Sequence, residues 1–404
     1  VFLIARTSPL LEYSTLALTV IALFGALTAF FAATIGLLQN DLKRVVAYST
    51  CSQLGYMIFA CGISNYSVGI FHLANHAFFK ALLFLSAGAV IHGTEDEQDM
   101  RKFGGLLKLL PFTYAMLFIG SLSLMGFPFL TGFYSKDFVL ENAYAKFSTE
   151  GHFCFWLGCF AAFFTAFYSI RLLFLIFLAE PNGFKPILRQ AHESSLMITI
   201  PLGILAVPSI FLGYYSHEMF VGMGTHFWGN SIFILPINFS QIDAEFVPWG
   251  IKMIPIVFSI SGALLAFLLF SFYKNFLYSL KKSMLGRVFY TFLNKKWFFD
   301  KIYNEYINQN IFIFGDEISY KILDKGLTEH FGPQGFSYLS FFNTNILKKT
   351  QTGYIYHYSF VLFIGASFFI FVAVFSAMQL SSLLDLRIVI VIFFSIHISS
   401  IKNK

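Results

Sequence analysis

Long apolar runs recur along the whole chain and decide what it can fold into. Each run holds about 20 residues, the length that an α-helix needs to cross a hydrocarbon core of about 30 Å. Charged residues make up only 12% of the chain, against about 25% in an average soluble protein. A membrane β-barrel would require segments of about ten residues that alternate in polarity, and the sequence shows no such pattern. The composition therefore predicts an all-α polytopic membrane protein.

The apolar runs define the candidate transmembrane segments, at residues 15–38, 45–63, 67–91, 109–143, 153–178, 194–214, 250–273 and 354–378. The segment 109–143 is too long for one simple helix, and Gly126, Pro128 and Gly132 interrupt it. Proline lacks the amide hydrogen and clashes with the preceding turn. A bilayer tolerates such a break where it is buried in protein or lines a wet cavity, so we expect a broken membrane helix here.

Charge and chain ends give further expectations. Most of the 27 Lys and Arg residues lie in alternate connections, at 39–44, 92–108, 179–193 and 274–353, and the positive-inside rule places these on the cytoplasmic or matrix side.

Residues 1–14 look like the end of a preceding helix and a loop, so we expect the C-terminal part of something longer, either a split-gene product or a processed or truncated chain. The tail 379–404 contains an apolar run, 386–397, that is too short for a confident crossing.

Residues 274–353 contain a long segment with one apolar and one polar face. Apolar side chains from Trp297 to Ile322 recur near helical spacing, and lysines and carboxylates occupy the other side. This pattern is typical of a helix that lies along a membrane surface or a neighbouring protein. From 296 to 325 it would be about 45 Å long at 1.5 Å per residue, so it could brace several neighbouring helices. The sequence GPQG, from Gly332 to Gly335, interrupts it.

One predicted span carries three titratable side chains. In "IFHLANHAFFKALLFLSAGAVIH", His72, His76 and Lys80 follow one another at four-residue spacing. At 100° per residue they form one stripe along about 12 Å of helix. A lysine near the centre of a membrane helix costs about 2.5–3.5 kcal/mol to insert. Groups about 6 Å apart that gain and lose protons can be joined by single waters. The stripe therefore predicts a proton relay, although the two histidines alone are as consistent with packing.

A second set of candidates follows the predicted break. Lys136 lies where freed backbone carbonyls and water can solvate an ammonium; an interfacial lysine paired with Asp137 is the alternative. Glu141 comes four residues after Asp137 and so lies on the same helix face. Lys43 begins a helix at the basic side, where topology explains its charge, and it is a secondary candidate for the inner end of a path.

The sequence gives no sign of a cofactor or metal site. It has no Rossmann fingerprint and no phosphate-binding loop of the Walker type. The four cysteines lie in apolar runs without metal-ligand or redox spacing, which favours a packing role. Any nucleotide or redox chemistry is therefore expected in other chains.

Several stretches together resemble a known family. "NDLKRVVAYSTCSQLGYM", the histidine stretch and "EQDMRKFGGLLKLLPFTYAMLFIGSLSLMGFPFLTGFYSKD" are similar to the antiporter-like membrane subunits of respiratory complex I, a group shared with the large subunit of Mrp-type antiporters. The amphipathic segment with "NKKWFFDKIYNE" and "QTGYIYHY" resembles the subunit 5 branch, since the sibling subunits 2 and 4 lack it. The resemblance covers residues 1–378.

The resemblance implies a domain organisation. Antiporter-like subunits hold two inverted repeats of five helices, each with one broken helix. Residues 15–178 would be the second repeat, with its broken helix at 109–143. Two further membrane helices would follow in 179–273, then a lateral helix on the matrix side in 274–353 and a C-terminal anchor at 354–378. The first repeat would come from a separate chain if the gene is split.

The resemblance also implies roles. Lys80 matches the central relay lysine, His72 and His76 its neighbours, Lys136 the lysine nearest the intermembrane exit, and Lys43 a further lysine. The chain would carry the central relay and exit half of a proton path, as a non-redox subunit of a translocase in the mitochondrial inner membrane. NADH, FMN, iron–sulfur clusters and ubiquinone would bind other subunits. Expected partners are the sibling subunits 4 and 2 along the lateral helix and membrane lipids, but no nucleic acid.

Two other interpretations stay open. The chain could be a structural or assembly subunit that braces the membrane arm through its lateral helix, with buried charges that carry no protons. It could also belong to an Mrp-type sodium/proton antiporter, which the lateral helix argues against. Replacing Lys80 and Lys136 by methionine separates the first interpretation from transport, because only transport predicts lost pumping in an assembled complex.

Overall fold

The computed structural model describes residues 1–377 and residue 391, so the predicted tail at 379–404 and its run 386–397 lie outside the described residues apart from that one position. The chain divides into two units, Val1–Ile302 and Tyr303–Lys404. The division falls inside the predicted lateral segment 274–353, and the domain boundaries given above remain predictions.

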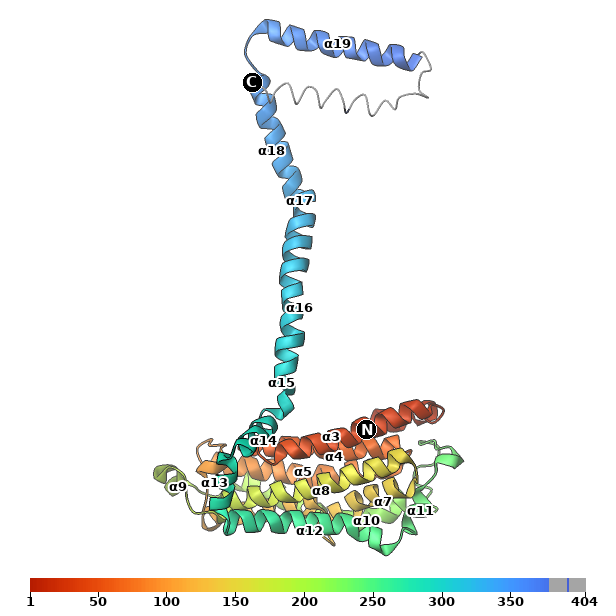
Figure 1. Ribbon diagram of the computed structural model, residues 1–404, viewed down its shortest axis with the longest axis vertical. Coiled ribbons are helices and arrows are strands. Elements are labelled where there is room, and N and C mark those ends of the chain that lie inside the picture. Colours follow the sequence, from red (N-terminus) through yellow and green to blue (C-terminus); the bar gives the residue numbers. More distant parts are fainter. Residues whose placement is uncertain (378–390, 392–404) are drawn as a thin grey trace. The chain divides into compact units, whose positions relative to one another are not determined.

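The first unit is a helical bundle. Its α-helices are α1 (Phe2–Arg6), α2 (Ser8–Leu11), α3 (Thr15–Gly36), α4 (Leu42–Gly62), α5 (Tyr66–Gly93), α6 (Pro111–Met125), α7 (Phe138–Ala145), α8 (Thr149–Leu173), α9 (Lys185–Gln190), α10 (Leu196–Val221), α11 (Gln241–Glu245), α12 (Trp249–Ser271), α13 (Lys274–Lys282), α14 (Met284–Asn294) and α15 (Phe299–Lys301). Short turns of 3₁₀-helix include η1 (Met100–Lys102) and η2 (Leu106–Lys108), and turns of π-helix form η3 (Phe133–Asp137) and η4 (Phe174–Leu178). The long helices lie nearly parallel to one another (Figure 1).

The described residues contain six helices long and apolar enough to cross a membrane: α3, α5, α8 continued through η4, α10, α12 and α19 (Ile355–Ala377). This confirms a multi-pass, all-α membrane protein. The segment predicted at 45–63 forms α4, which is less apolar because Ser49, Ser52 and Gln53 lie in its middle. These polar side chains are buried in the bundle, so α4 turns them toward protein and not toward lipid.

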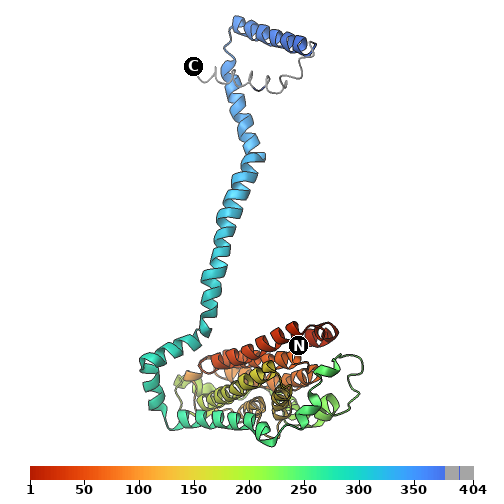
Figure 2. The same cartoon turned by 45° about the vertical axis from the view of Figure 1, so that its right-hand side comes forward.

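The bundle is held together by small residues and by capped helix ends. Buried alanines of α3 lie against α4, and a Cβ at Gly55 would lie only 2.5 Å from the amide nitrogen of Ala29. Small residues of this kind let membrane helices approach closely. Ser14 caps α3, and Ser148 caps α8, each by accepting a hydrogen bond from a backbone amide of the first turn. Helix α8 packs against α3, α12, α7 and α6, and Figure 2 shows the same bundle from a second side.

The segment 109–143 is a broken helix, as its Gly/Pro pattern predicted. Helix α6 ends at Gly126, which has φ +80°, and the amide of Phe127 reaches back to the carbonyl of Leu122 at 3.1 Å. This is the Schellman pattern that ends a helix at glycine. Gly132 is required at the far side of the break, because a Cβ there would lie 1.7 Å from the Ser123 carbonyl oxygen.

Helix α10 stabilises the break from outside. Ser123 donates to the Ser209 carbonyl at 2.7 Å, and Thr131 donates to the Pro208 carbonyl at 2.8 Å. The amide of Gly213 donates in turn to the Thr131 hydroxyl at 3.1 Å. The polar backbone of the broken segment is therefore satisfied by protein, as a non-helical segment at membrane depth requires.

The basic connections meet at one end of the bundle. Asp41 and Asp99 form an antiparallel bridge between two loops. Arg171, near the end of α8, donates to the carbonyls of Leu37 and Gln39 at 2.6 and 2.8 Å. Its guanidinium therefore holds the α3–α4 loop against α8.

Residues 274–302 contact the same end of the bundle. Tyr290 accepts a hydrogen bond from Asn40 at 3.3 Å, and the Trp297 ring lies edge-on to Phe31 at 5.1 Å. Lys296, Trp297 and Phe298 all have positive φ angles of 55–59°. These three residues break the helical path, so the next helix begins at Phe299 and not at 296.

The second unit contains the rest of the amphipathic segment and one membrane-length helix. Helical turns run on from η7 (Ile302–Asn308) through α16 (Gln309–Ile313), η8 (Phe314–Thr328) and α17 (Glu329–Phe331). The predicted interruption is at Gly332, and α18 (Pro333–Thr350) follows it. Large apolar side chains such as Tyr306, Phe312 and Phe314 are exposed along this segment. Helix α19 then matches the predicted span 354–378.

Candidate functional site

The polar stripe of α5 lies inside the bundle. His72, His76 and Lys80 are 0%, 4% and 4% exposed. The rings of His72 and His76 are 6.0 Å apart between centroids, and the His76 ring is edge-on to Phe79 at 5.2 Å. The four-residue spacing therefore places the three side chains along one protein-facing side of the helix, as predicted, and away from lipid.

His72 joins two other helices to the stripe. Its Nε2 atom lies 3.0 Å from Oε1 of Gln53 on α4, and its Nδ1 atom lies 2.9 Å from Oγ of Ser135. Ser135 belongs to η3, just after the break, and is the residue before Lys136. One imidazole thus connects α4, α5 and the broken helix. A neutral ring in this position donates through one nitrogen and accepts through the other.

Lys80 lies at the basic-side end of the stripe. Its ammonium donates to the hydroxyl of Ser49 on α4, and it stands over the Phe84 ring at 5.6 Å from the centroid. These partners are a neutral oxygen and an aromatic face. Neither partner supplies a carboxylate.

Lys136 occupies the broken helix itself and is 1% exposed. Its Nζ atom donates to the Thr165 hydroxyl of α8 at 2.9 Å and lies 5.5 Å from the centroid of the Tyr56 ring. The alternative of an interfacial lysine is wrong, because the side chain is enclosed by α4 and α8. Its described hydrogen-bond acceptor is Thr165 and not Asp137.

The two carboxylates predicted beside Lys136 lie differently. Asp137 is 7% exposed and faces the break, where a Cβ at Gly126 would lie 3.5 Å from its Oδ1 atom. Glu141, one turn further on, pairs with Lys252 of α12 at 3.8 Å between Oε2 and Nζ. The side chains of this pair are 16% and 27% exposed, and Lys252 lies in the first turn of α12, at the end away from the basic helix α13.

Lys43 is not part of the buried set. It is exposed in the first turn of α4, close to the capping residue Asp41. This position is at the basic end of the bundle, where the sequence placed it. Its suggested part in a path remains a prediction.

Several buried polar atoms around the stripe have no hydrogen-bond partner among the described residues. They are Nε2 of Gln53, both amide atoms of Asn75, Nε2 of His76 and Oδ2 of Asp137. Buried polar groups in proteins are almost always hydrogen-bonded, to protein or to ordered water. These atoms are therefore candidate hydrogen-bond partners for ordered water molecules inside the bundle.

The arrangement forms a chain of exchangeable groups. Lys80 and Ser49 stand at one end, His76 and His72 continue along α5, and Ser135 leads to Lys136. Imidazole and amine nitrogens gain and lose protons, and hydroxyl and amide groups carry hydrogen bonds between them. Intramembrane ionisable residues that face a bundle interior are typical of ion and proton pathways.

Sequence reasoning missed the partners that connect these groups. Ser49, Gln53, Ser135, Thr165 and Lys252 come from α4, η3, α8 and α12, far apart in the chain. A usable signal was present in "STCSQ", where four polar side chains interrupt an otherwise apolar run. The partnership of each one depends on helix packing, which spacing within one helix does not reveal.

Comparison with known proteins identifies the family. A family model described as "NADH:quinone oxidoreductase/Mrp antiporter, TM" matches residues 1–165, and one described as "NADH dehydrogenase subunit 5 C-terminus" matches residues 168–375. The chain belongs to the NADH dehydrogenase subunit 5 family. Both the histidine stripe and the broken helix fall within the first match, and the amphipathic segment falls within the second.

Individual members of the subunit 5 family agree with this assignment. The chain is 59% identical over 368 residues to NADH-ubiquinone oxidoreductase chain 5 of Phytophthora infestans, covering 91% of this chain and 55% of that protein. It is 57% identical to chain 5 of Marchantia polymorpha, over 92% of this chain and 56% of the relative. The chain thus spans little more than half the length of the curated relatives that it matches.

A solved structure supports the fold. The Mrp complex from Dietzia sp. DQ12-45-1b matches with a TM-score of 0.52 and 23% identity, covering 68% of this chain and 30% of that chain. The membrane bundle of this subunit 5 family member is therefore of the antiporter-like kind that the resemblance implied.

Proposed function

We propose that this chain is a proton-translocating membrane-arm subunit of an NADH:ubiquinone oxidoreductase. Protons would move along Lys80, His76 and His72 to Lys136. They would then leave past Asp137 and Glu141 on the side opposite the basic loops. The observation that carries the proposal is the hydrogen bond between His72 and Ser135, since it joins the stripe of α5 to the residue beside Lys136.

Water would complete this path. The unpartnered atoms of Gln53, Asn75 and His76 lie along the stripe, and ordered waters bonded to them would bridge the gaps between titratable groups. The 6.0 Å between the two imidazole centroids suits one intervening water. Protons would then pass by exchange along hydrogen bonds, and no group would need to travel.

The driving energy would come from outside this chain. We infer a non-redox role, with NADH, FMN, iron–sulfur clusters and ubiquinone bound by other subunits. Quinone reduction there would act on Lys80 and Lys136 through the electric field, because charges in a low-dielectric interior interact strongly over several ångströms. The setting would be the mitochondrial inner membrane, with the basic loops on the matrix side.

The amphipathic segment would form the contact surface for neighbouring subunits. Sibling subunits 4 and 2 would lie along residues 274–353, whose exposed apolar side chains include Phe312, Ile318 and Ile322. An apolar stripe this long costs free energy while it faces water, so a protein or lipid surface must cover it in the assembled enzyme.

Methionine replacement tests the transport role. Lys80→Met and Lys136→Met keep the length and apolar stem of the side chain and remove its titratable group. We expect an assembled complex in each case, with the ratio of protons pumped to electrons transferred reduced. Lys108→Met is the matched control, since it removes the same charge from an exposed position in η2; it should pump with the normal ratio.

A purely structural subunit is the competing function, and the exposed apolar side chains of residues 303–350 favour it. Under that function both buried lysines carry no protons, so an unchanged ratio in Lys80→Met and in Lys136→Met would refute the transport role. An Mrp-type sodium/proton antiporter predicts instead that sodium competes with protons in the same assay. A proton-to-electron ratio that falls equally with and without sodium excludes it.

A further inference from the structure

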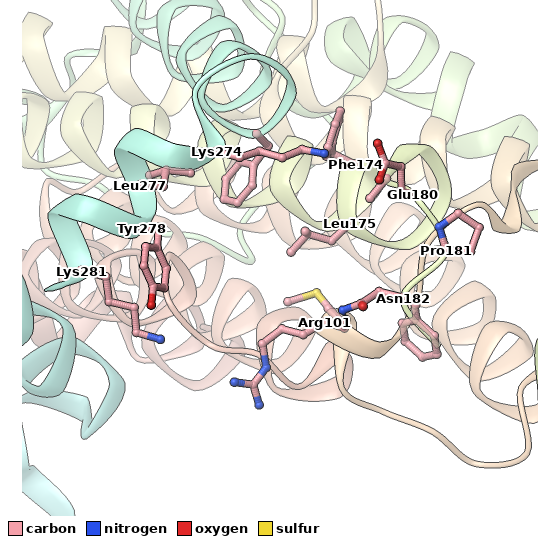
Figure 3. A pocket seen from close by; sticks show the side chains of 14 residues that line it. Arg101, Phe174, Leu175, Glu180, Pro181, Asn182, Lys274, Leu277, Tyr278 and Lys281 are labelled. Atoms are coloured by element: carbon pink, nitrogen blue, oxygen red, sulfur yellow. Dashed lines mark hydrogen bonds between the residues drawn. The ribbon is translucent and has the colours of Figure 1, made fainter. Parts of the chain in front are cut away.

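A pocket of about 490 Å³ opens at the basic end of the bundle, away from the stripe and the broken helix. Its walls come from η1 and the loop behind it, from the start of η4 with residues 179–182, and from α12 and α13. Figure 3 shows Lys274, Tyr278 and Lys281 of α13 on one side, with Arg101 and Asn182 opposite.

Three cations line the pocket. Arg101 is bonded to Asp99 with 2.6 Å between Nη2 and Oδ2, and this bond raises the pKa of the guanidinium. Lys274 and Lys281 are exposed, and the Lys281 ammonium stands 4.2 Å from the centroid of the Tyr290 ring. An aromatic face orients a cation without neutralising it. Since Asp99 compensates Arg101, the two lysines supply the net positive charge of the pocket.

The floor of the pocket is apolar and belongs to the membrane spans. Phe174 and Leu175 come from the end of the α8–η4 span, and Phe270 comes from the end of α12. The rings of Phe174 and Phe270 are in contact, 6.4 Å apart between centroids. A cationic rim above an aromatic floor at the end of two spans matches the junction between a lipid headgroup and its acyl chains.

The wall opposite α13 is held in place by hydrogen bonds. The backbone amide of Asn182 donates to the Phe103 carbonyl at 3.1 Å, and the side-chain amide of Asn182 donates to the Arg101 carbonyl at 2.8 Å. Glu180 is exposed at the edge of the pocket, so water screens its carboxylate. The cavity therefore has a fixed wall on one side and an amphipathic helix with two lysines on the other.

We propose that this pocket binds the phosphate group of an anionic glycerophospholipid from the leaflet on the basic side. Lys274 and Lys281 hold the phosphate oxygens, and the first part of the acyl chains lies on Phe174 and Phe270. Basic pockets between membrane helices on this side of a bilayer are suited to anionic headgroups. The apolar floor distinguishes this ligand from a free phosphate or an acidic peptide, neither of which has hydrocarbon to place there.

Lysine labelling tests the proposal in the isolated enzyme that contains the full chain. The enzyme is delipidated in mild detergent and titrated with phosphatidylglycerol, phosphatidylcholine or inorganic phosphate. An amine-reactive reagent and peptide mass spectrometry then report the protection of Lys274 and Lys281. We expect saturable protection by phosphatidylglycerol, with neither phosphatidylcholine nor inorganic phosphate protecting at the same concentration.

Charge-removing variants test whether the two lysines act locally. One lysine near an anionic lipid surface contributes about 1 kcal/mol, which corresponds to about fivefold in affinity. Lys274→Gln and Lys281→Gln should each weaken the protection of the remaining lysine by about fivefold. Lys282→Gln removes the same charge from the next position of α13, outside the pocket, and should change it less than twofold.

Two results would overturn the proposal. Equal protection by phosphatidylcholine or by inorganic phosphate would show that no anionic lipid is selected. A loss in Lys282→Gln as large as that in Lys281→Gln would show diffuse attraction to a charged surface and no built pocket. Neither result bears on proton pumping, so the two proposals succeed or fail separately.

Discussion

Thr165 offers a sharp test of how Lys136 is held, because its hydroxyl is the hydrogen-bond acceptor described for that buried ammonium, at 2.9 Å. Thr165→Val keeps the shape of the side chain and removes the hydroxyl. A hydrogen bond to a charged group is worth about 1.5–3 kcal/mol. Its loss should lower the ratio of charged to neutral Lys136 by about 10- to 150-fold, at about 1.4 kcal/mol for each factor of ten. The Tyr56 ring stays in place, so the ammonium keeps one favourable contact.

The assay is NADH-driven proton translocation by the enzyme in sealed vesicles. If charged Lys136 is an obligatory state of the path, the valine variant should pump more slowly, by up to the same factor. Thr165→Ser is the matched control, since it keeps the hydroxyl and loses only the methyl group; it should pump near the normal rate. A valine variant that assembles and pumps as fast as the serine variant would refute the reasoning.

Two further predictions concern the break and the basic loops. Gly132→Ala should destabilise the assembled subunit by about 1–3 kcal/mol through overpacking, whereas Gly88→Ala, with open space around it, should not; thermal unfolding of the isolated enzyme compares them, and equal midpoints would contradict the geometry. The bond from Lys102 lowers the pKa of Glu97, so its contribution to stability is present above the ordinary value of about 4.3 and is lost as the pH falls further. The protection factors of the amides of residues 98–99, which correct for the intrinsic pH dependence of exchange, should therefore fall below about pH 4. Glu97→Gln should show the lower protection already at neutral pH; protection that stays unchanged in both cases would count against this bond.

Much of the membrane fold followed from length and periodicity. A run of about 20 apolar residues has few alternatives to a spanning helix, so α3, α5, α8, α10, α12 and α19 were predictable. The break was predictable for a related reason. Gly126 and Pro128 give up helical hydrogen bonds, and a bilayer allows this only inside protein.

The site was half predictable. Regular spacing within one helix placed His72, His76 and Lys80 on one face, because a helix fixes the angle between its own residues. Which neutral groups would meet them was not predictable, since Ser49 and Thr165 approach through the packing of α4 and α8. The start of the amphipathic helix was also misplaced by three residues. The left-handed turn at Lys296–Phe298 is formed by residue types that rarely adopt positive φ angles, and no glycine in this stretch of the sequence indicates a turn.

The central claim is that the stripe of α5 and Lys136 form one proton path in series. The measurement that tests it most directly compares the proton-to-electron ratio of Lys80→Met, Lys136→Met and the double variant, each in the assembled enzyme. Two steps of one path fail together, so their losses are non-additive. The account predicts that the double variant pumps no less than the more impaired single variant. Losses that add up in the double variant, or a normal ratio in either single variant, would contradict it.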